Sequence, residues 1–294
     1  MSAPRHLPGH ITAWASAELA RATLRALSPI LVENGAQVLV TKGAYLAFAV
    51  APRPGYRVMG DADAVVVAGS FARVAEALRR SPDWVCVADD WSAKMFTRTS
   101  NRADLDLHRR PLPPGFGRIN LANLLARARD AREIFGPGVL VPDPEDGAAI
   151  SIGNYVKDRL GAVGHGKLAL DLQQLIEHRG LRPFGLAARL AEHGLRRIGL
   201  VAFTALCQTD PAWEPWISAL DAAPWEKYLA EQAVALSREH AARHPDLGYL
   251  ALRAIADSAW QAPVGLGLAA VRLGRDRVRR LLPKGRNRRF GGLF

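Results

Sequence analysis

The chain contains little cysteine and lacks long apolar runs. Its two cysteines, Cys86 and Cys207, are too few for a disulfide framework and lack the spacing of a metal-binding motif. Residues 1–10 lack the apolar core of a signal peptide, and arginines interrupt Leu195–Cys207 well short of the roughly 20 residues that cross a bilayer. We therefore expect a cytoplasmic protein with no transmembrane segment.

Acidic residues are scarce toward the C-terminus, so the positive charge is unevenly spread. The formal net charge is +11, and residues 271–294 alone carry +8. The basic residues of this stretch are Arg272, Arg275, Arg277, Arg279, Arg280, Lys284, Arg286, Arg288 and Arg289. Such a tail could bind an anionic partner, namely RNA phosphates, an anionic membrane surface or an acidic peptide, although it lacks an aromatic-interleaved RNA motif. The alternative is a solvated terminus without a partner.

The hydrophobic patterns predict an α+β fold followed by helices. With 49% hydrophobic and 23% charged residues, a chain of 294 residues can bury a substantial core and form two lobes. Helical spacing over residues 10–36 precedes short strands and helices that alternate up to residue 108. We expect a small mixed-sheet lobe with N-terminal helices over 1–115, a mainly α-helical lobe over 116–262 and the basic tail over 263–294.

Local signals place several elements. Gln37–Val40 is typical of a strand, and Ser70 is a suitable N-cap for a helix over Phe71–Arg80. Residues 120–135 have a helical pattern, whereas residues 137–144 contain prolines and glycine and predict a loop.

Two aspartates open an apolar segment. Asp61 and Asp63 lead into residues 64–67, an apolar run rich in valine that is typical of a buried strand. Residues two apart on a strand point to the same side, so the two carboxylates would lie side by side and repel each other. A shared cation relieves this repulsion, and Mg²⁺ with a triphosphate is a natural occupant. The alternative is a turn or a solvated strand edge.

A second acidic segment follows further along the chain. Asp104, Asp106 and His108 alternate with leucines, so on a strand they share one face. A third carboxylate beside Asp61 and Asp63 completes a set that can hold two divalent ions against the attacking and leaving oxygens of a nucleotidyl transfer. We prefer Asp106 as this third acid; Asp104 could share the role or be solvated.

The dipeptide Lys42-Gly43 ends the first expected strand. A glycine at this junction lets backbone N–H groups approach a phosphate, the start of the next helix adds partial positive charge, and the lysine adds a full charge. The alternative is an exposed lysine at a helix start. Arg57, four residues before Asp61, either binds triphosphate or holds the acidic loop by a charge-assisted bond.

The order of these motifs resembles a known family. The chain resembles the uncharacterised nucleotidyltransferase family of the polymerase β superfamily in three motifs. They are Lys42-Gly43, the pattern Tyr-Arg-x-Met-x-Asp-x-Asp over residues 56–63, and Asp-Leu-His over residues 106–108. The similarity covers roughly residues 30–210 and implies a nucleotidyltransferase-like lobe followed by a helical domain. By this resemblance, the turn is Lys42 and Gly43, the metal-binding pair is Asp61 and Asp63, and the third carboxylate is Asp106.

These observations predict an Mg²⁺-dependent nucleotidyltransferase. It would move a nucleoside monophosphate from an NTP, ATP among them, to an acceptor hydroxyl on a small molecule, a protein or RNA, with two Mg²⁺ ions. The expected catalytic and metal-binding residues are Asp61, Asp63 and Asp106, and the expected nucleotide-binding residues are Lys42, Gly43, Arg57 and His108. His108 could contact the substrate, act as a base, orient a carboxylate or make a structural hydrogen bond. Two alternatives stay open: a non-catalytic nucleotide-binding module, and an adaptor that acts through the basic tail.

Overall fold

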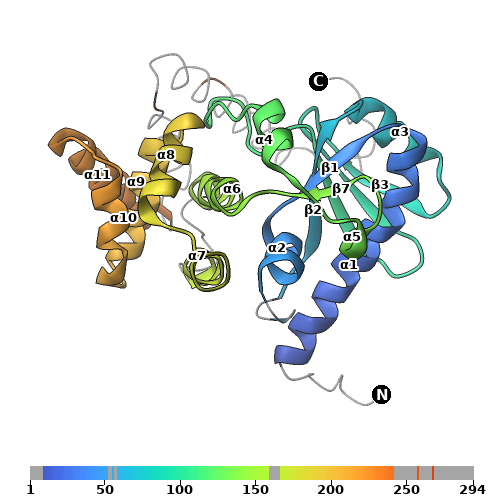
Figure 1. The fold of residues 1–294 in the computed structure, drawn as a ribbon, viewed down its shortest axis with the longest axis horizontal. Coiled ribbons are helices and arrows are strands. Elements are labelled where there is room, and N and C mark those ends of the chain that lie inside the picture. Colours follow the sequence, from blue (N-terminus) through green and yellow to red (C-terminus); the bar gives the residue numbers. More distant parts are fainter. Residues whose placement is uncertain are drawn as a thin grey trace. The chain divides into compact units, whose positions relative to one another are not determined.

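The computed structural model describes residues 9–51, 55, 58–158, 166–241, 257 and 267. For residues 9, 10 and 238–241 it describes the backbone alone. The described residues form two compact units (Figure 1). The first unit contains Met1–Pro111, Asn120–Ile150 and Asp171–Leu181, and the second contains Leu112–Ile119, Ser151–Leu170 and Arg182–Phe294, counting described residues in each. The predicted lobe limits at 115 and 262 stay predictions.

The first unit is built on a mixed sheet of seven strands among the described residues, in the order β3-β4-β5-β2-β1-β7-β6. The strands are β1 Gln37–Val40, β2 Asp61–Ala68, β3 Trp84–Asp89, β4 Ala93–Arg98, β5 Asp104–His108, β6 Arg129–Asp130 and β7 Val139–Val141. The pairs β2–β5 and β1–β7 are parallel, and the other neighbours are antiparallel. The predicted α+β class is therefore confirmed.

Helix α1, Gly9–Glu33, supports the strands that carry the acidic residues. Its buried side chains recur three or four residues apart, which is the spacing of one helix face: Ala13, Ala17, Ala20, Leu24, Leu27 and Leu31. Through this face α1 packs against β1, β2 and β5 (Figure 1). The centre of the sheet is therefore held against a helix.

Two further helical segments flank the central strands. The short helix α2, Lys42–Tyr45, follows β1 and continues directly into the π-helical segment η1, Leu46–Val50. Helix α3, Phe71–Arg80, follows β2 and is capped as the sequence predicts, because Ser70 Oγ accepts a hydrogen bond from Arg73 N at 3.3 Å.

The structure corrects the predictions for residues 120–144. The expected single helix is divided into α4, Leu121–Arg127, and α5, Arg132–Phe135, with β6 between them. The expected loop contains β7, whose three residues are buried and pair in parallel with β1. These predictions were wrong because tertiary pairing with β1 overrides the local proline and glycine signals.

Helices make up the second unit, and the chain passes between the units within α6, Pro144–Lys157, and again within α7, Gly166–Arg179. The remaining helices of the second unit are α8 Pro183–Glu192, α9 Arg196–Cys207, the 3-10 turn η2 Pro211–Trp213, α10 Glu214–Ala219 and α11 Pro224–Ala241. Phe203 of α9 stacks on Trp213 and Trp216, with ring centroids 6.1 and 5.6 Å away. An aromatic cluster therefore anchors α9 in this unit.

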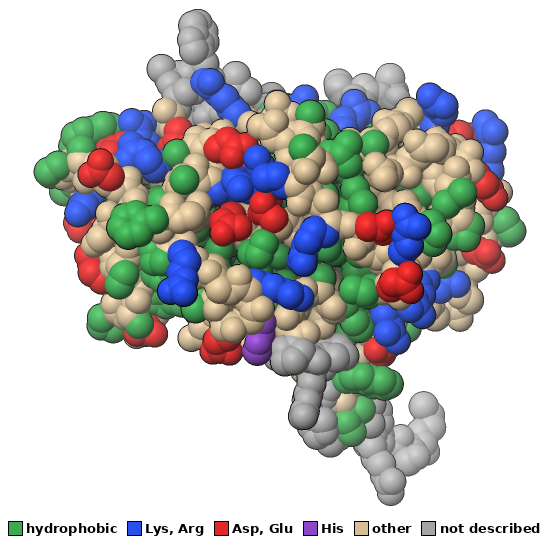
Figure 2. All heavy atoms as spheres, viewed as in Figure 1, with side chains coloured by type: hydrophobic (Ala, Val, Ile, Leu, Met, Phe, Trp, Pro, Cys, Tyr) green, Lys and Arg blue, Asp and Glu red, His purple; other side chains and the backbone are tan. Residues whose placement is uncertain are grey.

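The described surface shows mixed charge. On the face drawn in Figure 2, basic side chains lie beside acidic ones. Within the described ranges, no helix has both the length and the apolar composition to cross a bilayer. The predicted basic tail, apart from Gly267, lies outside the described residues, and so does Arg57.

Candidate metal and nucleotide site

The parallel pairing of β2 with β5 brings the acidic residues of the two strands together. Asp63 lies opposite Asp106, and Asp61 lies opposite Asp104. On the other face of the two strands, alanines and leucines are fully buried: Ala62, Ala64, Leu105 and Leu107. The alternation of the sequence therefore places apolar residues in the core and acidic residues on one shared face.

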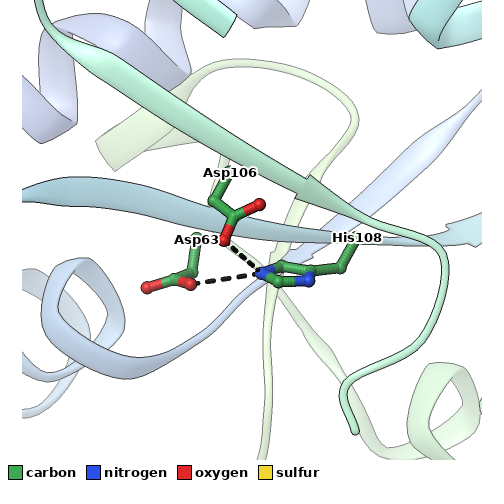
Figure 3. Close-up of side chains that lie close together, drawn as sticks. All are labelled: Asp63, Asp106 and His108. Carbon is green, nitrogen blue, oxygen red and sulfur yellow. Dashed lines mark hydrogen bonds and ion pairs between the residues drawn. The ribbon is translucent and has the colours of Figure 1, made fainter. Parts of the chain in front are cut away.

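His108 completes a group of three side chains on this face (Figure 3). Its Nε2 atom lies 3.3 Å from Asp63 Oδ1 and 3.1 Å from Asp106 Oδ2. One ligand atom from each residue lies within 4.8 Å of the other two. Asp63 is 5% exposed at its side chain, whereas His108 and Asp106 are 17% and 22% exposed. The group is therefore largely sheltered but reachable from solvent.

Lys42 is brought to the same group by the pairing of β1 with β2. Thr41 N donates a hydrogen bond to the backbone oxygen of Asp63 at 3.1 Å, which fixes the chain just before Lys42. Lys42 itself has a φ of 54°, in the left-handed region, which costs a non-glycine residue about 1–2 kcal/mol. Its ammonium forms a hydrogen-bonded ion pair with Asp63 Oδ1. A strained backbone and a partly buried ion pair therefore occur at one residue, a combination typical of functional positions.

The charges of this group shift one another's pKa values. Burial acts to raise the pKa of Asp63, but the Lys42 ammonium and the hydrogen bond from His108 outweigh burial and hold this pKa at about 2. Burial acts to lower the pKa of Lys42, and the charges of Asp63, Asp61 and Asp106 raise it above its usual value. The two partners therefore stabilise each other's charged form.

Burial and hydrogen bonding also act in opposite directions on the pKa of His108. Burial and the Lys42 charge act to lower the pKa of His108, whereas its hydrogen bonds with Asp106 and Asp63 raise it, and the net pKa is above the usual value. Lys42 and His108 both contact the same carboxylate oxygen of Asp63, Oδ1. The repulsion expected between neighbouring carboxylates is relieved here by groups of the protein itself.

The other predicted residues lie around this group. Asp61 is half-buried on the same face of β2, and its charge reaches Lys42, although it is not one of the three residues whose ligand atoms converge. Asp104 accepts a hydrogen bond from Thr97 Oγ1 on β4. Gly43 is buried in α2, next to Lys42, which carries the left-handed backbone of this turn.

The donor set fits a divalent cation. Two carboxylate oxygens and one imidazole nitrogen are common ligands of Mn²⁺, Fe²⁺ and Zn²⁺, and carboxylates also bind Mg²⁺. The residues of this group therefore suit the kind of ion that phosphoryl chemistry requires. Asp63 and Asp106 belong to the predicted set, and His108 joins them as a potential ligand.

Two features of this region were not foreseen from the sequence. One is the direct contact between Lys42 and Asp63, for which the only sequence signal is that their two strands are neighbours in the chain. The other is Tyr45, whose buried hydroxyl lacks a hydrogen-bond partner among the described residues. Its ring lies against Gly147 so closely that an added Cβ would approach Cε1 to 2.5 Å.

Comparison with known proteins assigns a class to this fold and acidic site. The chain belongs to the uncharacterised nucleotidyltransferase family, whose sequence model matches residues 10–209. Among solved structures, the chain is similar to an antigenic nucleotidyltransferase-like protein from Paracoccidioides brasiliensis, at 17% identity and a TM-score of 0.45, over 72% of this chain and 98% of that one. No curated protein matches the chain.

Proposed function

We propose that this protein is a divalent-metal-dependent nucleotidyltransferase that moves a nucleoside monophosphate from an NTP to an acceptor hydroxyl. The observation that carries the proposal is the register of β2 and β5, which sets Asp63 directly opposite Asp106 in a chain of the nucleotidyltransferase family. Like charges placed side by side destabilise a sheet, so this pair needs a cation beside it, which Lys42 supplies in the structure and a bound metal would supply in the working enzyme.

The acidic residues would hold the metal. Asp63 and Asp106 would bind it directly, and Asp61, one step earlier on the same face of β2, would complete the set predicted from the sequence. Two Mg²⁺ ions are the expected occupants, and when bound they would neutralise phosphate charge and activate the attacking oxygen. The donor could be ATP or another NTP.

Lys42 would exchange partners when the nucleotide binds. Its ammonium lies on Asp63 in the structure, and the Lys42 side chain as a whole is 24% exposed, so the lysine can turn toward an incoming phosphate. A metal ion on Asp63 would repel the ammonium, and the β- and γ-phosphates would attract it. Gly43 would let the backbone lie close to the same phosphates, and Arg57, outside the described residues, stays a predicted triphosphate contact.

The reaction requires one proton transfer and one displacement at phosphorus. The acceptor oxygen attacks the α-phosphorus as its proton passes to a base, the bond from the α-phosphorus to the bridging oxygen breaks, and pyrophosphate leaves with the bonding electrons. Asp106 would serve as this base, because a carboxylate held beside the metal can accept the proton of the acceptor hydroxyl. Most of the rate enhancement would come from positioning and charge stabilisation.

Calorimetric titration tests the nucleotide site. We would titrate each of the four NTPs, with and without Mg²⁺, into the wild-type protein and the double variant Asp61→Asn/Asp63→Asn. We expect Mg²⁺-dependent binding that the variant loses. A control variant, Asp83→Asn/Asp89→Asn, removes the same charge from exposed positions of the same unit and should bind as the wild type does. Equal NTP affinity in the wild type and the Asp61/Asp63 variant would refute the assignment.

A non-catalytic nucleotide-binding module is the second candidate. One observation favours it: the Lys42 ammonium already neutralises the Asp63 carboxylate. The two candidates predict different results in the same titration. A module of this kind would bind NTP equally well with and without Mg²⁺, whereas the enzyme needs the metal.

A further inference from the structure

We infer that His108 is itself a metal ligand, and that the group Asp63, Asp106 and His108 takes a first-row transition-metal dication such as Mn²⁺ in preference to Mg²⁺. The inference rests on the proposed function, since it concerns the same site, but it makes a separate claim about which cation binds and through which atoms.

The spacing of the three donors supports direct ligation. Neighbouring ligands of an octahedral ion with bonds of about 2.1–2.2 Å lie about 3.0–3.1 Å apart. His108 Nε2 lies 3.1 Å from Asp106 Oδ2 and 3.3 Å from Asp63 Oδ1, and all three ligand atoms fall within 4.8 Å of one another. The imidazole nitrogen therefore stands where a ligand adjacent to both carboxylates would stand.

Hydrogen bonds alone explain the convergence of these three side chains less well than a bound cation does. A ring nitrogen carries at most one hydrogen, and Nε2 of His108 faces carboxylate oxygens from two different residues (Figure 3). One hydrogen shared between two acceptors makes two weak bonds, whereas a cation in the same place would bind all three atoms. The Lys42 ammonium on Asp63 Oδ1 shows independently that this position draws a cation.

The imidazole decides which cation is preferred. Mg²⁺ is a hard ion that favours oxygen ligands and keeps several waters, so a ring nitrogen adds little to its affinity. Imidazole raises the affinity for transition-metal dications, which increases along the series from Mn²⁺ to Cu²⁺. A site with one imidazole and two carboxylates is therefore expected to favour Mn²⁺ over Mg²⁺ by on the order of tenfold.

Metal titration of the full chain without nucleotide tests this claim. We would treat the protein with a chelator, remove the chelator and titrate Mn²⁺ and Mg²⁺ separately, following free Mn²⁺ by electron paramagnetic resonance and heat by calorimetry. We expect one Mn²⁺ site with an affinity about tenfold above that for Mg²⁺. Equal affinities, or no Mn²⁺ binding at millimolar concentration, would overturn the inference.

Substitution of His108 tests whether its ring nitrogen, and not the two carboxylates, sets the preference for Mn²⁺ over Mg²⁺. His108→Asp gives an all-oxygen set, so the ratio of Mn²⁺ to Mg²⁺ affinity should fall about tenfold while Mg²⁺ binding is kept. His178→Asp is the matched control, because His178 is a partly exposed residue of α7, and it should leave the ratio unchanged. An unchanged ratio in His108→Asp would refute ligation by His108.

One measurement needs no variant and so does not depend on variant folding. Pulsed electron paramagnetic resonance of the Mn²⁺-loaded wild type should show the coupling of a directly bound ¹⁴N nucleus, and its absence would overturn the inference. The proposed function can fail separately: ¹⁴N coupling without any NTP binding would leave the metal site and reject the transferase. Mg²⁺-dependent NTP binding without ¹⁴N coupling would do the reverse.

Discussion

Lys42 and Asp63 form an ion pair in which a lysine with left-handed backbone neutralises a buried carboxylate between two paired strands. The same carboxylate oxygen also faces His108 Nε2 at 3.3 Å. The acidic group is thus compensated in part by the ammonium of Lys42. Any metal that binds Asp63 has to compete with Lys42, which links the lysine to both stability and ligand binding.

Substitution of Lys42 should change phosphate recognition selectively. We expect Lys42→Met to weaken binding of a nucleoside triphosphate by roughly tenfold or more and to change monophosphate binding little, because the ammonium would contact the β- and γ-phosphates. Calorimetry with ATP and AMP in the presence of Mg²⁺ measures both. Lys94→Met, which removes a lysine paired with Asp89 elsewhere on the sheet, is the control. Equal losses for ATP and AMP would place Lys42 away from the outer phosphates.

The free energy of unfolding of the metal-free protein should fall at low pH, and part of this loss should come from protonation of Asp63. The pKa of Asp63 in the folded protein is about 2, below the usual 3.8, so its contribution to the free energy of unfolding is present above pH 3.8 and is lost as the pH falls toward 2. In Lys42→Met the main cause of the lowered pKa is gone and burial acts to raise it. We therefore expect the Asp63 pKa to rise in the variant, as measured by carboxyl ¹³C titration with chelator present. A pKa that stays near 2 in Lys42→Met would contradict this description of the pair.

A second ion pair of the first unit should contribute to stability. Arg127 of α4 binds Asp146 of α6 through two hydrogen bonds, Nε to Oδ2 at 2.9 Å and Nη2 to Oδ1 at 3.0 Å, and the Asp146 side chain is fully buried. Arg127→Met removes this bidentate partner and should lower the free energy of unfolding by about 3 kcal/mol. Urea denaturation at neutral pH measures the loss.

The control for this prediction is an exposed pair. Arg132 and Asp130 form an ion pair whose side chains are 64% and 46% exposed, so Arg132→Met should change stability little. Similar losses in the two variants would show that burial does not distinguish these pairs.

The sequence predicted the central strands because their signals are local. The run that follows Asp63 and the alternation through His108 are each visible within a few residues, and both strands occur where they were expected. The cap at Ser70 is equally local. These elements position the two carboxylates of the site, so its core could be predicted from short patterns.

Other features depend on contacts between distant residues. Strand β7 is an apolar triplet between glycine and proline, and it forms only because β1 is available to pair with it. The left-handed backbone of Lys42 and its contact with Asp63 follow from the antiparallel pairing of β1 with β2, which no local pattern specifies. Their geometry therefore could not be predicted from spacing.

Isotope transfer tests the central claim most directly. The protein would be incubated with a cell extract as a source of acceptors, together with ATP labelled at the α- or the γ-phosphate, in parallel with Asp63→Asn and Asp106→Asn. Nucleotidyl transfer predicts that α-label enters an acceptor, that γ-label leaves as pyrophosphate, and that both variants lose the activity. Transfer of γ-label instead, or no transfer and no pyrophosphate with any of the four NTPs, would contradict the proposed function.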